Sequence, residues 1–112
     1  MNTQKFDVIV IGGGASGLFL ASQLPPSMRV AVVESNERVG KKLLATGNGK
    51  CNLTNLDMNI VHYNKPSFVE SFLDRFDAHD TIATFEKMGL VTKVIDKRVY
   101  PYSECASTVL DV

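Results

Sequence analysis

Residues 7–17, which read DVIVIGGGASG, decide the fold that this sequence predicts. Residues 8–11 form an unbroken run of valine and isoleucine, which is typical of a strand buried on both faces of a parallel sheet. The run leads into glycines with the G-x-G-x-x-G spacing and then into residues 18–24, a helix-forming sequence. Strand, glycine turn and helix in this order predict a Rossmann-like α/β domain with a parallel sheet.

Each motif glycine has a physical reason to be glycine. Gly12 allows the chain to turn sharply out of the strand, Gly14 allows backbone to approach a pyrophosphate, and Gly17 allows the helix to pack on the strand. Ala15 and Ser16 would offer backbone N–H groups at the positive end of the helix dipole. The motif therefore predicts a phosphate site made of backbone.

An acidic residue follows the second expected strand. Pro25 and Pro26 end the helix, and residues 29–34 read as a buried strand that ends in Glu34. A carboxylate about 20 residues beyond the glycines accepts hydrogen bonds from ribose hydroxyls and repels a 2′-phosphate. The alternative is that Glu34 only caps an exposed strand end. The complete pattern predicts binding of an adenine dinucleotide.

The composition limits the classes of protein to which this chain can belong. The chain has 112 residues, 45% of them hydrophobic and 21% charged, with no net charge, which suits one globular domain without a basic surface for nucleic acid or anionic membrane. Two cysteines, Cys51 and Cys105, and an N-terminus without a signal sequence indicate reduced thiols, a cytoplasmic location and no metal site.

Residues 35–55, SNERVGKKLLATGNGKCNLTN, read as a loop with a short strand. Lys41 and Lys42 could neutralise a pyrophosphate. Asn48, Asn52 and Thr54, with backbone N–H groups freed by the nearby glycines, could bond a flavin ring. The alternative is a solvated loop whose lysines serve solubility, and composition favours neither.

Residues 12–18, Glu34 and residues 39–55 together resemble bacterial FAD-dependent oxidoreductases of the aminoacetone-oxidase-like or NAD(P)/FAD-dependent family, among the two-dinucleotide-binding-domain flavoproteins. That family carries GKKLLATGNGRCNLTN, and this chain has Lys50 in place of the arginine. Residues 98–103, RVYPYS, are similar to its G-R-x-F-P-x-S segment, with Lys97 for the glycine and Tyr100 for the phenylalanine. The resemblance covers essentially the whole chain.

The resemblance implies FAD as cofactor, with NAD(P)H as a candidate electron donor. It implies hydride transfer between a nicotinamide or organic donor and a small organic acceptor. The predicted cofactor-binding residues are Gly12, Gly14, Ala15, Ser16, Gly17, Glu34, Lys41, Lys42, Asn48, Gly49, Lys50, Cys51, Asn52 and Thr54.

The resemblance also implies that residues 1–112 are the N-terminal portion of an FAD-binding domain, with an incomplete sheet and without the substrate domain. No catalytic residue can be assigned, and an open sheet edge predicts poor solubility or dimerisation. The rival interpretations are a fragment of an NAD-dependent dehydrogenase, a non-catalytic dinucleotide-binding fragment, and a tRNA-modifying flavoprotein, which the zero net charge disfavours.

Between the motifs the chain reads as structural. Ser67–Glu70 fits a capping box, and Phe68, Phe72 and Phe76 recur on one helical face, which predicts a core.

Further along, Asp80 is expected to cap a helix over residues 81–88 that Gly89 ends, before a strand over residues 90–95 and a helix from residue 103. His62 and His79 are isolated from any acid or nucleophile pattern and read as ordinary surface or loop histidines.

Overall fold

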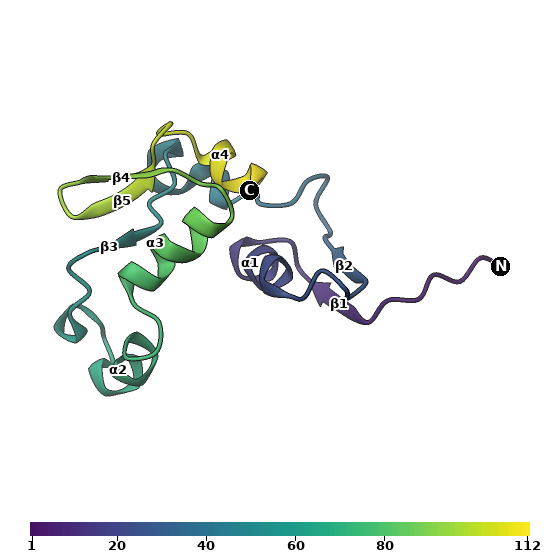
Figure 1. Ribbon diagram of the computed structural model, residues 1–112, viewed down its shortest axis with the longest axis horizontal. Coiled ribbons are helices and arrows are strands. Elements are labelled where there is room, and N and C mark those ends of the chain that lie inside the picture. Colours follow the sequence, from purple (N-terminus) through teal and green to yellow (C-terminus); the bar gives the residue numbers. More distant parts are fainter. The chain divides into compact units, whose positions relative to one another are not determined.

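The computed structural model describes residues 1–112, which form two compact units, Met1–Leu43 and Leu44–Val112 (Figure 1). Each unit has a sheet of its own: a parallel pair in the first and an antiparallel sheet of three strands in the second. No helix of the chain combines the length and the apolar character that a membrane crossing requires.

The first unit is a β-α-β arrangement. Strand β1 (Val8–Ile11) leads into helix α1 (Ala15–Gln23), and the chain returns in strand β2 (Val30–Val33). The strands run parallel, with Val8 opposite Val30 and Ile11 opposite Val33. This confirms the predicted Rossmann-like α/β fold with a parallel sheet.

The prediction that β1 is buried on both faces is wrong. Val10 is 7% exposed, whereas Ile9 and Ile11 are 57% and 80% exposed. Successive side chains of a strand point to opposite faces, and α1 covers one face of the pair. Ile9 and Ile11 point to the other face, which no element of the first unit covers.

The second unit is built on the sheet β3-β5-β4. Strand β5 (Arg98–Pro101) is central and pairs antiparallel with β3 (Thr54–Asn55) and β4 (Thr92–Ile95). The β4–β5 turn has two residues with positive φ, which is the backbone of a type I′ hairpin. Val99 of β5 is fully buried and faces both neighbours, Thr54 and Val94, so it is the centre of this core.

Helices α3 (Ala78–Lys87) and α4 (Ala106–Asp111) complete this core with the buried residues Ala78, Ala106 and Val109. The predicted strand over residues 90–95 and the helix from residue 103 are therefore present, with later starts at Thr92 and Ala106.

Asp80 is not the cap of α3. Asp77 is the N-cap residue, and its side chain accepts hydrogen bonds from the N–H groups of His79 and Asp80 while Asp80 bonds back to the Asp77 N–H. The helix thus begins one turn earlier than predicted, in a complete capping box. Gly89 has φ +96 and ends the helix as predicted.

Helix α2 (Pro66–Leu73) differs most from its prediction. It begins at Pro66 with no side-chain cap, so Ser67 lies inside the first turn and makes no capping box. Phe68, Phe72 and Phe76 are 66%, 57% and 44% exposed, which contradicts the predicted core. Helix α2 packs mainly against the short helix η2 (Ile60–His62), which is too small to bury an aromatic face, and the rings of Phe68 and Phe72 contact each other with centroids 5.1 Å apart.

Candidate functional site

The glycine turn of the first unit joins the ends of both parallel strands. Gly12 has φ +98, which L side chains rarely adopt, and its N–H donates to the carbonyl oxygen of Val33 at 2.7 Å. The chain therefore leaves β1 sharply while still bonded to β2, as the motif predicts.

Gly17 brings α1 close to the strand. A Cβ atom at Gly17 would lie 2.0 Å from the carbonyl oxygen of Gly12 and 3.2 Å from Cγ1 of Val10. No side chain can occupy that space unless backbone moves. The first turn of the helix thus rests directly on the end of β1.

Gly14 is different, because a Cβ atom there would meet nothing within 4 Å. Gly14 is the N-cap residue of α1 and gives no side-chain hydrogen bond, and Ala15 and Ser16 after it are exposed. The first N–H groups of the helix therefore face open space, and a Cβ on Gly14 would partly fill that space. This is the form of an anion site at a helix N-terminus.

Glu34 reaches back to this turn. Its Oε2 accepts a hydrogen bond from the N–H of Gly13 at 2.8 Å, and its Oε1 accepts from the N–H of Asn36 at 3.0 Å. These bonds, the one from Asn36 first, lower the pKa of the Glu34 carboxyl below its ordinary value, so it is ionised at neutral pH. A carboxylate at the end of β2 thus lies beside the helix N-terminus.

The segment after β2 folds over the same turn. The N–H of Gly40 donates to the carbonyl oxygen of Gly13 at 2.7 Å, and a Cβ atom on Gly13 would lie 2.6 Å from Cγ1 of Val39. Lys41 and Lys42 follow in an exposed turn. Lys41 and Lys42 therefore directly follow a residue that is hydrogen-bonded to the glycine turn, in the same unit as Glu34.

The remaining predicted residues lie in the second unit, at the end of η1 (Leu43–Gly49) and directly after it; sequence reasoning expected a loop here and no helical turns. Gly47, Asn48, Gly49 and Cys51 all have positive φ, between +55° and +83°. A Cβ atom on Gly47 would lie 2.6 Å from the backbone nitrogen of Asn52. The result is a tight loop that no ordinary run of side chains would adopt.

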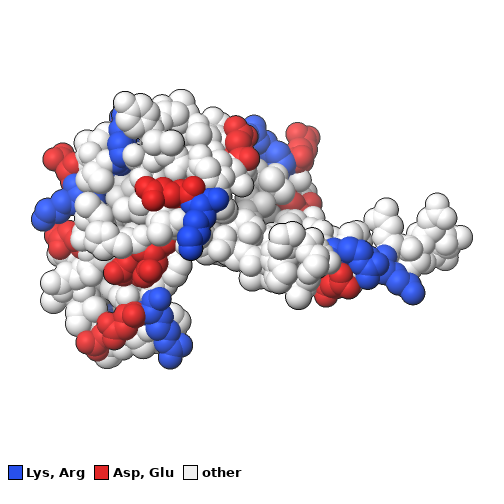
Figure 2. Space-filling model, viewed as in Figure 1, with Lys and Arg blue, Asp and Glu red and all other residues white.

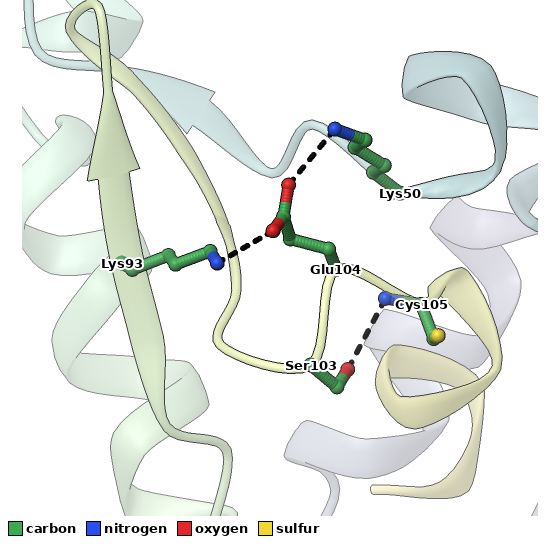
Figure 3. A network of polar contacts seen from close by, with 5 residues as sticks. All are labelled: Lys50, Lys93, Ser103, Glu104 and Cys105. Carbon is green, nitrogen blue, oxygen red and sulfur yellow. Dashed lines mark hydrogen bonds and ion pairs between the residues drawn. The ribbon is translucent and has the colours of Figure 1, made fainter.

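Lys50 is held by an acid that the sequence did not mark. Its Nζ lies 2.8 Å from Oε1 of Glu104, and the Nζ of Lys93 lies 2.7 Å from Oε2 of the same carboxylate (Figure 3). The two ammonium groups lower the pKa of Glu104 to about 2. Sequence reasoning missed Glu104 because an ion pair across 54 residues leaves no local pattern.

The two cysteines have different surroundings. Cys51 is buried, and burial raises the pKa of its thiol, which disfavours the reactive thiolate. Cys105 is exposed and donates its N–H to the hydroxyl of Ser103 at 3.2 Å (Figure 3). Cys51 is thus a packed residue in the loop, whereas Cys105 is open to solvent.

Asn52 and Thr54 line a pocket of about 530 Å³ within the second unit. His62, on the same pocket, has its Nε2 3.8 Å from Oδ2 of Asp57. The prediction that His62 is isolated from any acid is therefore wrong, although His79 is exposed on α3 as expected.

Comparisons with known proteins identify the family. Residues 6–112 match the model of the HI0933-like protein Rossmann domain. The chain is 40% identical over 108 residues to the 3-dehydro-bile acid delta(4,6)-reductase of Clostridium scindens, a match that covers 92% of this chain and 26% of that protein. It is 38% identical over 91 residues to the ribosomal RNA dihydrouridine synthase of Haemophilus influenzae, covering 79% of this chain and 23% of that protein.

The Escherichia coli protein of the same name is 38% identical over 92 residues, covering 78% of this chain and 22% of that protein. The chain thus spans about a quarter of the length of these curated relatives. Because the family model covers nearly every residue, this chain belongs to the HI0933-like Rossmann-domain family.

Proposed function

We propose that this chain is part of the FAD-binding domain of a flavin-dependent oxidoreductase. The observation that carries the proposal is the bond from the Gly13 N–H to the Glu34 carboxylate, beside the open N-terminus of α1. A helix N-terminus favours a phosphate, and an ionised carboxylate next to it favours ribose hydroxyls over a 2′-phosphate.

The first unit fits the adenosine and pyrophosphate of such a cofactor. The N–H groups of Ala15 and Ser16 would hold the pyrophosphate, Glu34 would accept from the ribose, and the exposed ammonium groups of Lys41 and Lys42 would balance charge. The open space at Gly14 is what a phosphate needs and what a larger residue would remove.

The loop of the second unit supplies the groups proposed for the flavin ring. They are Asn48, Gly49, Lys50, Cys51, Asn52 and Thr54. When bound, FAD would accept and donate hydride, while the chain would orient the ring and tune it through hydrogen bonds.

The names of the relatives support a narrower reaction class. One reduces a bile acid at its delta(4,6) positions, and two make dihydrouridine, which requires saturation of the uracil C5=C6 bond. We propose that the acceptor here is likewise a carbon–carbon double bond conjugated to a carbonyl, with NAD(P)H as electron donor. An aminoacetone-oxidase-like activity has less support, because these relatives are named for reductive chemistry.

The expected lack of a nucleic acid partner finds no support among the relatives, since two act on ribosomal RNA. On the face in Figure 2, Lys and Arg residues lie among Asp and Glu residues in small mixed groups.

Visible absorption of the purified chain after incubation with FAD and desalting tests the proposal. Retained flavin bands, lost in Gly14→Val and Glu34→Ala, are the expected result. Glu37→Ala is the matched control, because Glu37 is an exposed acid three residues beyond Glu34, and it should retain FAD.

Other outcomes would change the assignment. Retention of NAD without FAD would favour the dehydrogenase alternative. Bound FAD that neither NADH nor NADPH reduces would favour a non-catalytic binding fragment.

A further inference from the structure

Glu104 lies in a strained turn between β5 and α4. Its φ is +54, and its N–H donates to the carbonyl oxygen of Pro101 at 2.9 Å. A glutamate rarely adopts this left-handed conformation, because its Cβ atom crowds the neighbouring carbonyl oxygen. Such strain persists only where contacts outside the turn favour it.

The Glu104 carboxylate makes such contacts with two lysines. Its Oε1 accepts from the ammonium group of Lys50, 54 positions earlier in the chain, at 2.8 Å. Its Oε2 accepts from the ammonium group of Lys93 on β4 at 2.7 Å. Figure 3 shows the Glu104 side chain pointing between the two lysines, with one oxygen toward each. Both distances are those of charge-assisted hydrogen bonds.

The segment that carries Lys50 is strained as well. Residues 46–51 read TGNGKC, and Lys50 is their only charged residue. The N–H of Cys51 donates to the carbonyl oxygen of Thr46 at 3.0 Å, which closes the segment on itself. Positive φ occurs at Gly47, Asn48, Gly49 and Cys51. The ion pair with Glu104 therefore ties a strained loop to a strained turn.

The three side chains together carry one net positive charge. Lys50 and Lys93 contribute two ammonium groups and Glu104 one carboxylate, which its pKa of about 2 keeps ionised at neutral pH. All three are partly exposed, and exposed ion pairs add little to the stability of a whole domain. The larger effects of Glu104 are therefore local: it fixes the Lys50 ammonium group and neutralises one of the two positive charges.

We infer that Glu104 is a positioning residue of the flavin site, which holds Lys50 at the end of residues 46–51 and limits this cluster to one net positive charge. The inference rests on the proposed function, in which Lys50 and its neighbours in the loop contact the flavin ring. Positive charge near the ring favours reduced flavin, which is more negatively charged than oxidised flavin. Glu104 would thus lower the reduction potential of bound FAD.

Amide hydrogen exchange of the chain without FAD measures the positioning. Glu104→Gln keeps the shape of the side chain and removes its charge, and it should lower protection of the Lys50 and Cys51 amides about fivefold. Lys93→Met is the matched variant, because it breaks the other ion pair of the same carboxylate. It should keep protection of these two amides within about twofold of wild type. Equal losses in both variants, or no loss in Glu104→Gln, would overturn the inference.

The reduction potential of bound FAD measures the charge effect, which a merely structural role would not produce. Glu104→Gln raises the net charge of the cluster to two, and Lys93→Met lowers it to zero. The potential should rise by about 30 mV in the first variant and fall by about 30 mV in the second, for a tenfold change in preference for reduced flavin. The double variant has one net positive charge again, so its potential should return close to that of wild type while its loop stays unprotected.

The outcomes separate this inference from the proposed function. Shifts of the potential in the same direction in both single variants would indicate a loosened site and overturn the inference. Bound FAD with wild-type potentials in both variants would refute this inference alone. A chain that retains no FAD would refute the proposed function and, with it, the flavin role of Glu104.

Discussion

Replacing Gly17 with alanine separates the structural glycine of the turn from Gly14, the glycine that we propose faces the pyrophosphate. The added Cβ atom would lie 2.0 Å from the carbonyl oxygen of Gly12, which is backbone and cannot rotate away. Either α1 must shift along the strand or the turn at Gly12 must open. Gly14→Ala is the matched variant, because the same added atom meets nothing within 4 Å there.

The magnitude follows from two opposing effects. Forcing an extra carbon into packed structure costs about 3 kcal/mol at the upper end, and a backbone collision belongs at that end. Replacing glycine with alanine within a helix stabilises the helix by about 1 kcal/mol. We therefore expect Gly17→Ala to destabilise the first unit by about 2 kcal/mol, whereas Gly14→Ala should cost about 0.7 kcal/mol, because glycine is a better N-cap residue than alanine.

Amide hydrogen exchange is the suitable assay. The three tyrosines lie at positions 63, 100 and 102, so tyrosine fluorescence reports on the second unit only. A loss of about 2 kcal/mol corresponds to protection factors in β1 and β2 that are about thirtyfold lower. In Gly14→Ala the protection should fall only about threefold, while FAD retention falls.

The reasoning fails if Gly17→Ala keeps wild-type protection in β1 and β2. It also fails if Gly14→Ala loses protection as much as Gly17→Ala does, because then the two glycines would share one structural role.

The other expected outcomes concern the second unit. Because the lysines lower the pKa of Glu104 to about 2 from 4.5, its contribution to stability is complete above pH 4.5 and is lost as the pH falls toward 2, and Glu104→Gln should remove that part of the pH dependence in urea unfolding curves. Peptide mapping after alkylation at pH 8 should show Cys105 reacting at least about tenfold faster than Cys51, whose thiol is buried and has a raised pKa. Val99→Ala, at the fully buried centre of the sheet, should lower the free energy of unfolding by about 2 kcal/mol in the same urea curves.

Each of these has a control within the chain. Glu86→Gln, on the exposed side of α3, should keep the wild-type pH dependence, and a Glu104→Gln curve that falls as steeply as the wild-type curve between pH 4.5 and 2 would contradict the ion-pair network. Faster alkylation of Cys51 than of Cys105 would contradict its burial. Val94→Ala, an exposed valine in β4 opposite Val99, should cost less than Val99→Ala, and equal losses would contradict the placement of the core.

The Rossmann-like unit was predictable because its determinants are local. The turn at Gly12, the close approach at Gly17 and the helix start at Ala15 all depend on residues within one strand–turn–helix segment, so spacing alone identifies them. Glu34 was predictable for a related reason, since a parallel crossover returns the end of β2 to the end of β1.

Burial was not predictable from the same pattern. The phenylalanines of α2 have the spacing of a core face, and Ile9 and Ile11 have the composition of a buried strand, yet all are exposed. A periodic pattern states which side chains share a face. Whether another element covers that face depends on how distant segments pack.

By itself, then, the sequence determined the β-α-β unit and the glycine turn with Glu34 at the end of the second strand. Only the tertiary structure decided that Glu104 holds Lys50 and Lys93, and that Asp57 and His62 share a pocket with Asn52. The conformation of the glycine turn can be predicted from neighbouring residues, because backbone dihedral angles depend on local sequence. Ion pairs and pockets are formed by side chains that are far apart in the sequence and close in the fold. The spacing of residues in the sequence does not predict which of these side chains will be in contact.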